Sequence, residues 1–259
     1  MLAIDFSRLI AGVEGYGWTF LRITGFMLLA PLFGSNVVPR RVKLTMSILL
    51  TLMLAPIVPA VATIEIFSAV ALLTAVQQLL IGLAIGFVAQ IVFDALILSG
   101  QIVSNTMGLG FATMVDPSRG ASTAVVGQFF MILGLLLLLA MDGHIALLGV
   151  LVDSFRSLPP GPAGLDINGV GAVVMFGGKI FEAGTLIALP AVVGLVLVNL
   201  ALGIVSRAAP QLNLFAVGFP MTMLLGFIML MLCLPALPGN FERFFGDALA
   251  VATRLSNGR

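Results

Sequence analysis

The side chains in this sequence that could perform chemistry are few and lie far apart. His144 is the only histidine and Cys233 the only cysteine. Ion coupling or metal binding at His144 would need further ligands, and Asp142 is the one candidate nearby. The GxxxxGK[ST], HExxH and GxSxG patterns are absent, so ATP hydrolysis and the common hydrolase reactions lack their residues. We therefore expect no catalytic residue, no metal site and no cofactor, and an intramembrane enzyme using His144 and Asp142 is the lowest-ranked alternative.

The composition places the chain in a membrane. Of its 259 residues, 60% are hydrophobic and only 9% are charged, and the mean hydropathy is +1.20. Soluble domains carry roughly 45–50% apolar and about 25% charged residues. The net charge of +1 provides no basic field for nucleic acid. We expect an all-α membrane protein without a nucleic-acid partner.

Six apolar stretches run between charged residues, which predicts about six long, partly broken membrane helices arranged as hairpins. The third stretch is too long for one upright span, and Asp94 closes it. We expect that carboxylate to lie at the membrane interface or to face a wet interior, because charge in hydrocarbon is costly. The stretches are Ile23–Pro39, Leu44–Ile64, Ile66–Phe93, Gly120–Met141, Ala183–Ser206 and Ala208–Phe241.

The basic residues give conflicting indications of orientation. The cluster Arg40, Arg41 and Lys43 favours a cytoplasmic turn by the positive-inside rule, which with six spans would put both termini outside. The C-terminal tail is also basic, and the same rule would draw it inward. Some segments are therefore expected to cross the bilayer in an unconventional way, and the orientation stays open.

Residues 104–120, SNTMGLGFATMVDPSRG, interrupt two of the longest apolar runs. Met107, Phe111 and Met114 are soft or bulky apolar side chains, and they alternate with small residues that include Gly108 and Gly110. Such a segment suits a deformable hydrophobic seal, since a thioether adapts to the shape of its neighbours and glycine lets the backbone move. An ordinary interfacial loop is the alternative.

Proline and glycine mark the other breaks. Asp116-Pro117 predicts an N-cap and a helix that resumes near Ser118, and Pro56 with Pro59 predicts a helix stop or kink near Ala55. Gly82 and Gly86 form a GxxxG pattern, which indicates either a close helix–helix contact or the glycine-rich background. Residues 158–168 read as a Pro/Gly linker.

A helical hairpin is predicted at residues 206–220, where a helix stops at Pro210 and a second apolar helix starts near Pro220. The tip carries Gln211 and Asn213, whose amides can line an aqueous entrance without fixing a charge. An ordinary polar turn is the simpler alternative.

Together these motifs resemble the family of the flagellar biosynthetic protein FliR and its relatives in virulence-type type III secretion. The resemblance covers nearly the whole chain, and its most specific part is SRAAPQLNLF at residues 206–215 with Gly218-Phe219-Pro220. The supporting matches are Pro31, Pro39-Arg40-Arg41-Val42, Gly82 and Gly86, Met107-Gly108, Asp116-Pro117 and Gly143-His144.

The resemblance implies a subunit of a hetero-oligomeric export gate in the bacterial inner (cytoplasmic) membrane, at the flagellar basal body. The implied partners are FliP, FliQ and FlhB, with unfolded flagellar proteins in transit. Residues 1–157 would be FliP-like and include the plug loop 104–120, and residues 169–259 would be a FliQ-like hairpin. The implied plug residues are Met107, Gly108, Gly110, Phe111, Met114, Asp116, Pro117 and Arg119, and those of a channel entrance are Arg207, Gln211, Asn213 and Phe215.

Two positions depart from the family pattern, because Gln78 and Gln101 stand where relatives often have Glu. A role of those carboxylates in proton handling is thus in doubt here, although neutral amides can still hydrogen-bond across helices. A small-molecule secondary transporter is the main alternative function, motivated by the broken helices, by Asp94 and by the pair Lys179 and Glu182. Its two halves should match in hydropathy, and here they do not.

Overall fold

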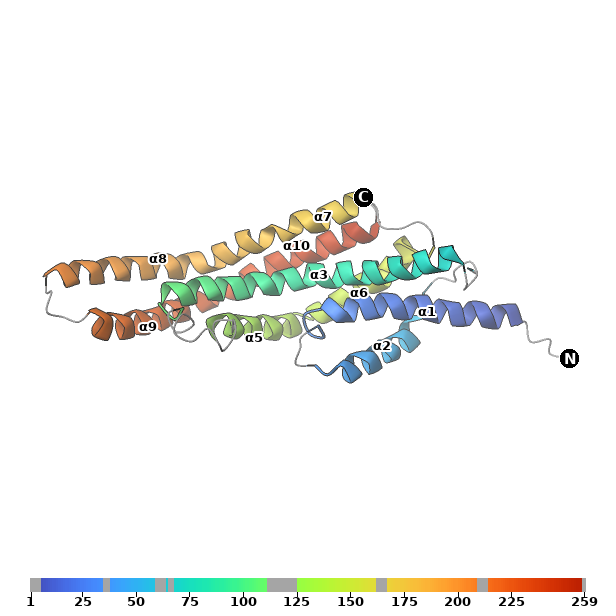
Figure 1. Ribbon diagram of the computed structural model, residues 1–259, viewed down its shortest axis with the longest axis horizontal. Helices are drawn as coiled ribbons and strands as arrows, with labels where there is room; N and C mark the ends of the chain where they lie inside the picture. Colours follow the sequence, from blue (N-terminus) through green and yellow to red (C-terminus); the bar gives the residue numbers. More distant parts are fainter. Residues whose placement is uncertain are drawn as a thin grey trace. The chain divides into compact units, whose positions relative to one another are not determined.

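The computed structural model describes residues 6–34, 38–58, 64, 68–110, 125–161, 167–208 and 214–257, with side chains left out at 6–14, 214–217 and 256–257. Every regular element in these residues is a helix, which confirms the all-α prediction (Figure 1). The elements are α1 (Phe6–Leu29), α2 (Arg40–Leu54), α3 (Ala69–Thr106), α5 (Val125–Ala140), α6 (Gly143–Ser157), α7 (Ile167–Gly177), α8 (Lys179–Ala208), α9 (Leu214–Cys233), the 3-10 turn η2 (Leu234–Ala236) and α10 (Leu237–Asn257).

The chain forms two compact units that are interleaved in sequence. Unit 1 consists of Met1–Ile91, Met141–Gly177 and Gly246–Arg259, and unit 2 of Val92–Ala140 and Gly178–Phe245. Helices α3 and α10 therefore each contribute residues to both units. The division predicted from sequence, with a linker at residues 158–168, follows chain order instead and stays a prediction. Of the described residues in that linker, 158–161 are not helical, whereas 167–168 begin α7.

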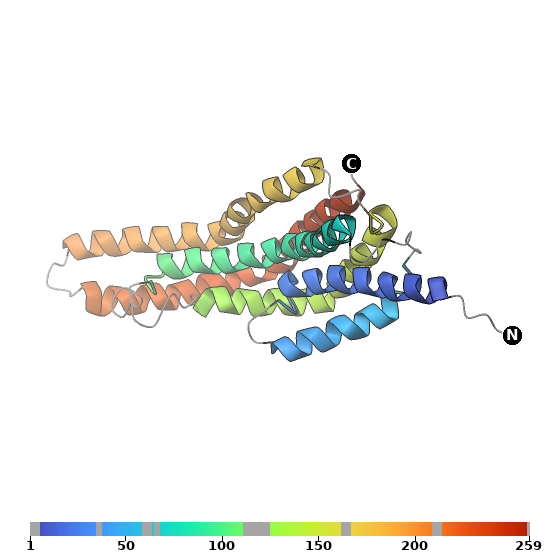
Figure 2. The ribbon, with the colours of Figure 1, turned by 45° about the vertical axis from the view of Figure 1, so that its right-hand side comes forward.

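In unit 1, glycines bring α1 into backbone contact with α3. A Cβ atom on Gly82 would overlap the carbonyl oxygen of Arg22 and lie 2.8 Å from the backbone nitrogen of Phe26. One turn later, a Cβ on Gly86 would lie 2.8 Å from the carbonyl oxygen of Phe26. From α1, Gly25 meets the backbone of Leu79 in the same way. Only glycine permits so small a separation between the backbones of α1 and α3. In the same unit, α2 packs beside α1 (Figures 1 and 2).

In unit 2, the C-terminal part of α3 is held between α5 and α8. A Cβ on Gly100 would lie 2.6 Å from the backbone nitrogen of Gly127 on α5, and one on Gly184 of α8 would lie 3.1 Å from the carbonyl oxygen of Ala95. Phe241 of α10 meets Phe93 edge to face at a centroid distance of 5.9 Å. Helices α8 and α9 lie side by side and form the predicted C-terminal hairpin (Figure 2).

Three stretches in the described part of the chain are long and apolar enough to cross a membrane: Ala69–Thr106, Ile167–Ala208 and Gly218–Leu255. Helices α5 and α6 add a fourth if this bent pair counts as one broken span. The predicted number of six is therefore approximate. Helix α2, for example, has 15 residues, which reach only about 22 Å across a hydrocarbon core of about 30 Å.

Two predicted boundaries need correction. Helix α3 does not close at Asp94 but continues to Thr106, since the residues after Asp94 are again mostly apolar and helix-compatible. Helix α9 begins at Leu214 and contains Pro220 as its seventh residue. Such a proline removes one hydrogen bond and crowds the preceding turn, which kinks a helix but does not have to end it. Helix α2, in contrast, ends at Leu54 as its downstream prolines predict.

The glycine contact between α1 and α3 is testable by adding one methyl group. Gly82→Ala should destabilise the protein by about 1–3 kcal/mol through overpacking, which lowers the midpoint of thermal unfolding by about 2–4 °C per kcal/mol. The matched control is Gly171→Ala on α7, where a Cβ meets nothing within 4 Å. That variant should be neutral or slightly stabilised, since alanine favours helix. Equal midpoints for the two variants would contradict the contact.

Candidate functional site

Helix α3 ends in a hydrogen-bonded glycine turn at the start of the segment predicted to form a seal. Gly108 has a φ of +83°, which favours glycine. The Leu109 amide donates to the carbonyl of Ser104 and the Gly108 amide to that of Asn105, both at 3.0 Å. This pair of bonds is the Schellman arrangement, which satisfies the last carbonyls of a helix. The helix therefore stops here through local chemistry that needs no partner protein.

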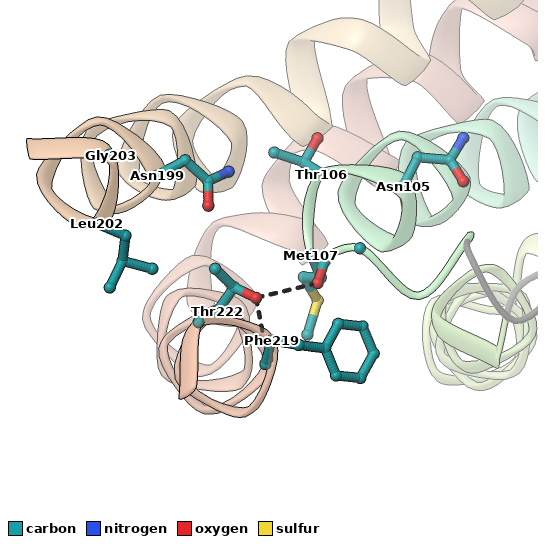
Figure 3. A pocket seen from close by; sticks show the side chains of 10 residues that line it. Asn105, Thr106, Met107, Asn199, Leu202, Gly203, Phe219 and Thr222 are labelled. Carbon is teal, nitrogen blue, oxygen red and sulfur yellow. Dashed lines mark hydrogen bonds between the residues drawn. The ribbon is translucent and has the colours of Figure 1, made fainter. Parts of the chain in front are cut away.

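Met107, at this turn, packs against Gly226 and Thr222 of α9, which we name the Met107 seat. Its side chain is fully buried, and a Cβ on Gly226 would lie 2.6 Å from its Cγ and Cε atoms. The Thr222 hydroxyl shares its one proton between the carbonyls of Phe219, at 3.0 Å, and Met107, at 3.4 Å (Figure 3). The absence of a side chain at Gly226 makes room for the thioether, so α9 fixes where the segment after α3 begins.

A cavity of about 290 Å³ adjoins this seat. Figure 3 shows Asn199 and Leu202 projecting from α8, and Asn105 and Thr106 at the end of α3. Its polar side chains are neutral amides and hydroxyls, and the glycines at 108, 203 and 218 expose backbone to it. The cavity can therefore accept hydrogen-bonding, uncharged groups.

The structure locates only some of the predicted site residues. Met107, Gly108 and Gly110 lie in the turn after α3, and Arg207 is an exposed residue in the last turn of α8. Phe215 belongs to the first turn of α9, where only its backbone is described. The remaining predicted residues, Phe111, Met114, Asp116, Pro117, Arg119, Gln211 and Asn213, lie outside the described residues.

A second polar site, which the sequence reasoning missed, lies in unit 1. Arg22 of α1 has no solvent-exposed surface. Its Nε donates to Oε1 of Gln78 on α3 at 2.8 Å, and one Nη donates to the same atom. The other Nη donates to the carbonyl and the hydroxyl of Ser154 on α6 at 2.7 and 3.0 Å, and the carbonyl of Leu158 accepts a further bond at 2.6 Å. One guanidinium thus joins three segments of unit 1.

The surroundings of Arg22 keep the guanidinium charged without a carboxylate among these bonds. Burial lowers the pKa of Arg22 from its ordinary value to about 9, so the group remains protonated at neutral pH. It lies at the C-terminal end of α6, where the helix dipole is negative, and stacks over the Phe155 ring at 4.1 Å from the ring centroid. The sequence did contain indications of this cluster. Arg22 directly precedes the first apolar stretch, and Gln78 was singled out as an amide able to bond across helices.

No group of three or more His, Cys, Asp or Glu side chains that could hold a metal ion occurs in the described residues. What the structure does define is a helical membrane protein with long apolar helices, a glycine-built helix contact in unit 1 and a capped helix stop in unit 2.

Comparison with known proteins identifies the family. Residues 13–248 match the model of the bacterial export proteins, family 1, and the chain belongs to that family. It is 38% identical over 247 residues to the flagellar biosynthetic protein FliR of Escherichia coli K12, covering 95% of this chain and 94% of that protein. FliR of Pectobacterium carotovorum is 38% identical over 99% of this chain and 100% of its own length, and FliR of Bacillus subtilis is 34% identical over 83% and 84%.

The Arg22 cluster can be tested against a surface arginine. Arg22→Met would leave the oxygens of Gln78, Ser154 and Leu158 without their donor, at about 1–3 kcal/mol for each buried group left unsatisfied. We expect a clear loss of folded protein and a lower unfolding midpoint in detergent.

The matched control is Arg156→Met on α6, since that side chain is 63% exposed and forms a surface ion pair with exposed Asp153. Surface ion pairs contribute about 0–1 kcal/mol to stability. Adding Gln78→Leu to Arg22→Met should recover part of the loss, because it removes one of the unsatisfied acceptors. Equal midpoints for the Arg22 and Arg156 variants would show that the cluster contributes little.

Proposed function

We propose that the chain is a non-enzymatic subunit of the flagellar type III protein export gate. The observation that carries this proposal is the family match over residues 13–248, together with relatives named flagellar biosynthetic protein that align over almost the whole chain. The apolar helices support a place in a membrane, which we propose is the bacterial inner membrane at the flagellar basal body. Its partners would be FliP, FliQ and FlhB, and unfolded flagellar proteins would pass through the assembly.

Within this gate, the segment from Met107 to Arg119 would form the plug. Its support in the described residues is the abrupt end of α3, where the glycine turn removes the chain from the helix axis directly after Met107. Further support is the seat on α9, which holds Met107 at one fixed point. A sealing segment needs a fixed attachment point, because a plug that moves along its channel would not keep the channel closed.

The entrance of the gate is proposed to lie at the tip of the hairpin formed by α8 and α9. Exposed Arg207 stands in the last turn of α8, and α9 begins at Leu214. Between them the sequence carries Gln211 and Asn213, and Phe215 is the second residue of α9. Neutral amides at such a tip would allow substrates of many sequences to enter without binding one tightly.

Assembly can be tested by expressing the chain with and without FliP and FliQ. We expect it to co-purify with them as one complex and to be unstable or aggregated without them, because large apolar side chains on α8, such as Leu197 and Ile204, are more than 60% exposed in the single chain. A stable, monodisperse chain that takes up a solute in a saturable way after reconstitution would instead favour a transporter.

The plug can be tested in vesicles that contain the assembled gate. Deletion of residues 108–113 should make the complex leak ions or small molecules, since a hydrophobic constriction blocks them by dewetting, while part of the secretion survives. Gly226→Val should cause a weaker leak, because its side chain displaces Met107. The control is Gly239→Val on α10, where a Cβ meets nothing within 4 Å. A deletion complex as tight as the unmodified one would refute the sealing role.

A further inference from the structure

One side of α3 carries polar side chains within unit 2. Asp94, Gln101 and Asn105 are spaced by seven and four residues, so a period of 3.6 returns them to nearly the same side of the helix. Gln101 and Asn105 are exposed and Asp94 is half-buried. Asp94 is also the one charged residue of α3. We name these three residues the polar stripe.

The polar stripe runs between two helix contacts. On one side of it α5 packs against α3, with Gly127 above the carbonyl of Ile97. On the other side α8 packs against α3, with Gly184 against Leu98 and the carbonyl of Ala95. Gln101 and Asn105 therefore lie on an exposed part of α3 between these two contacts, whereas Asp94 is half-buried.

The stripe ends at the cavity beside the Met107 seat. Asn105 lines this cavity together with Thr106, Asn199 and Thr222 (Figure 3). Asn199 stands out on α8 because nearby exposed residues, such as Leu197 and Leu200, are apolar. Amides from two helices thus border one hollow directly before the point where α3 stops.

Such groups do not belong in lipid. Polar side chains in membrane segments almost always face a bundle interior or a water-filled cavity, because hydrocarbon offers them no hydrogen-bond partners. Leu186, Leu197 and Ile204, which are also exposed on α8, are apolar and suit a lipid or protein neighbour.

We propose that the polar stripe of α3, with Asn199, lines the aqueous passage of the gate on the side where Met107 begins the plug. This inference rests on the proposed function and adds which face of the chain meets the passage. A surface of neutral amides solvates the peptide groups of an extended polypeptide but offers no apolar pocket to retain it. It suits the transit of chains of unrelated sequence.

The test is the accessibility of single cysteines to a charged, membrane-impermeant methanethiosulfonate in the assembled gate. After Cys233→Ala, Gln101→Cys and Asn105→Cys are each compared with Leu197→Cys, which is 63% exposed on α8, and with Leu96→Cys, which is 1% exposed on the buried side of α3. Reagent is applied from each side of the membrane in turn. We expect the two stripe cysteines to react at least about tenfold faster than either control, since a charged reagent is excluded from hydrocarbon.

Stripe cysteines that react no faster than Leu197→Cys from both sides would overturn the proposal and would indicate that a partner subunit or lipid covers this face. A second measurement does not depend on cysteine variants: Gln101→Glu should leave the yield of assembled gate unchanged, whereas Leu197→Glu should reduce it severalfold. An equal loss for both variants would also overturn the proposal. If the gate co-purifies and the plug deletion leaks while the stripe stays unreactive, the proposed function stands and only this lining is wrong.

Discussion

Backbone contact between helices, made possible by glycine, is the constraint on which the packing in both units depends. Apolar side chains provide no drive for helices to associate in lipid, because lipid tails are equally apolar. Close approach, which gains dispersion energy, must replace that drive. In unit 1 this occurs where Gly82 and Gly25 allow α1 and α3 to touch, and in unit 2 where Gly100 meets Gly127. Larger residues at these positions would separate the helices, and the side chains that depend on them would lose their partners.

Arg22 illustrates that dependence within unit 1. Its carbonyl oxygen lies directly beneath Gly82, so the contact that brings α1 onto α3 also brings the guanidinium to Gln78. The same guanidinium then closes the end of α6 through Ser154 and Leu158. A buried cation is tolerated because its donors face oxygen atoms, the helix dipole and an aromatic ring, which together offset the loss of hydration.

Unit 2 handles its polar groups differently. The last carbonyls of α3 are satisfied locally by the glycine turn, and Thr222 adds one bond from α9 to the carbonyl of Met107. The amides of Gln101 and Asn105, in contrast, remain on the exposed side of α3. In the proposed gate, the helix end would anchor the plug, and the amides would lie beside it along the proposed passage.

The sequence by itself determined the helical membrane class, the stop of α2 before its prolines, the interruption after Thr106 and the membership in an export family. The first three properties follow from local composition and from spacing along the chain, and the family from the resemblance of its motifs to those of known relatives. It did not determine that α3 continues through Asp94, that α9 includes Pro220, or that the units interleave, because a single charge or proline in an apolar run is compatible with either outcome. Only tertiary structure brought Arg22 to Ser154, 132 residues away, and Met107 to Gly226. Contacts between residues so distant in sequence depend on how helices pack, and helical periodicity contains no information on which helix a given face will meet.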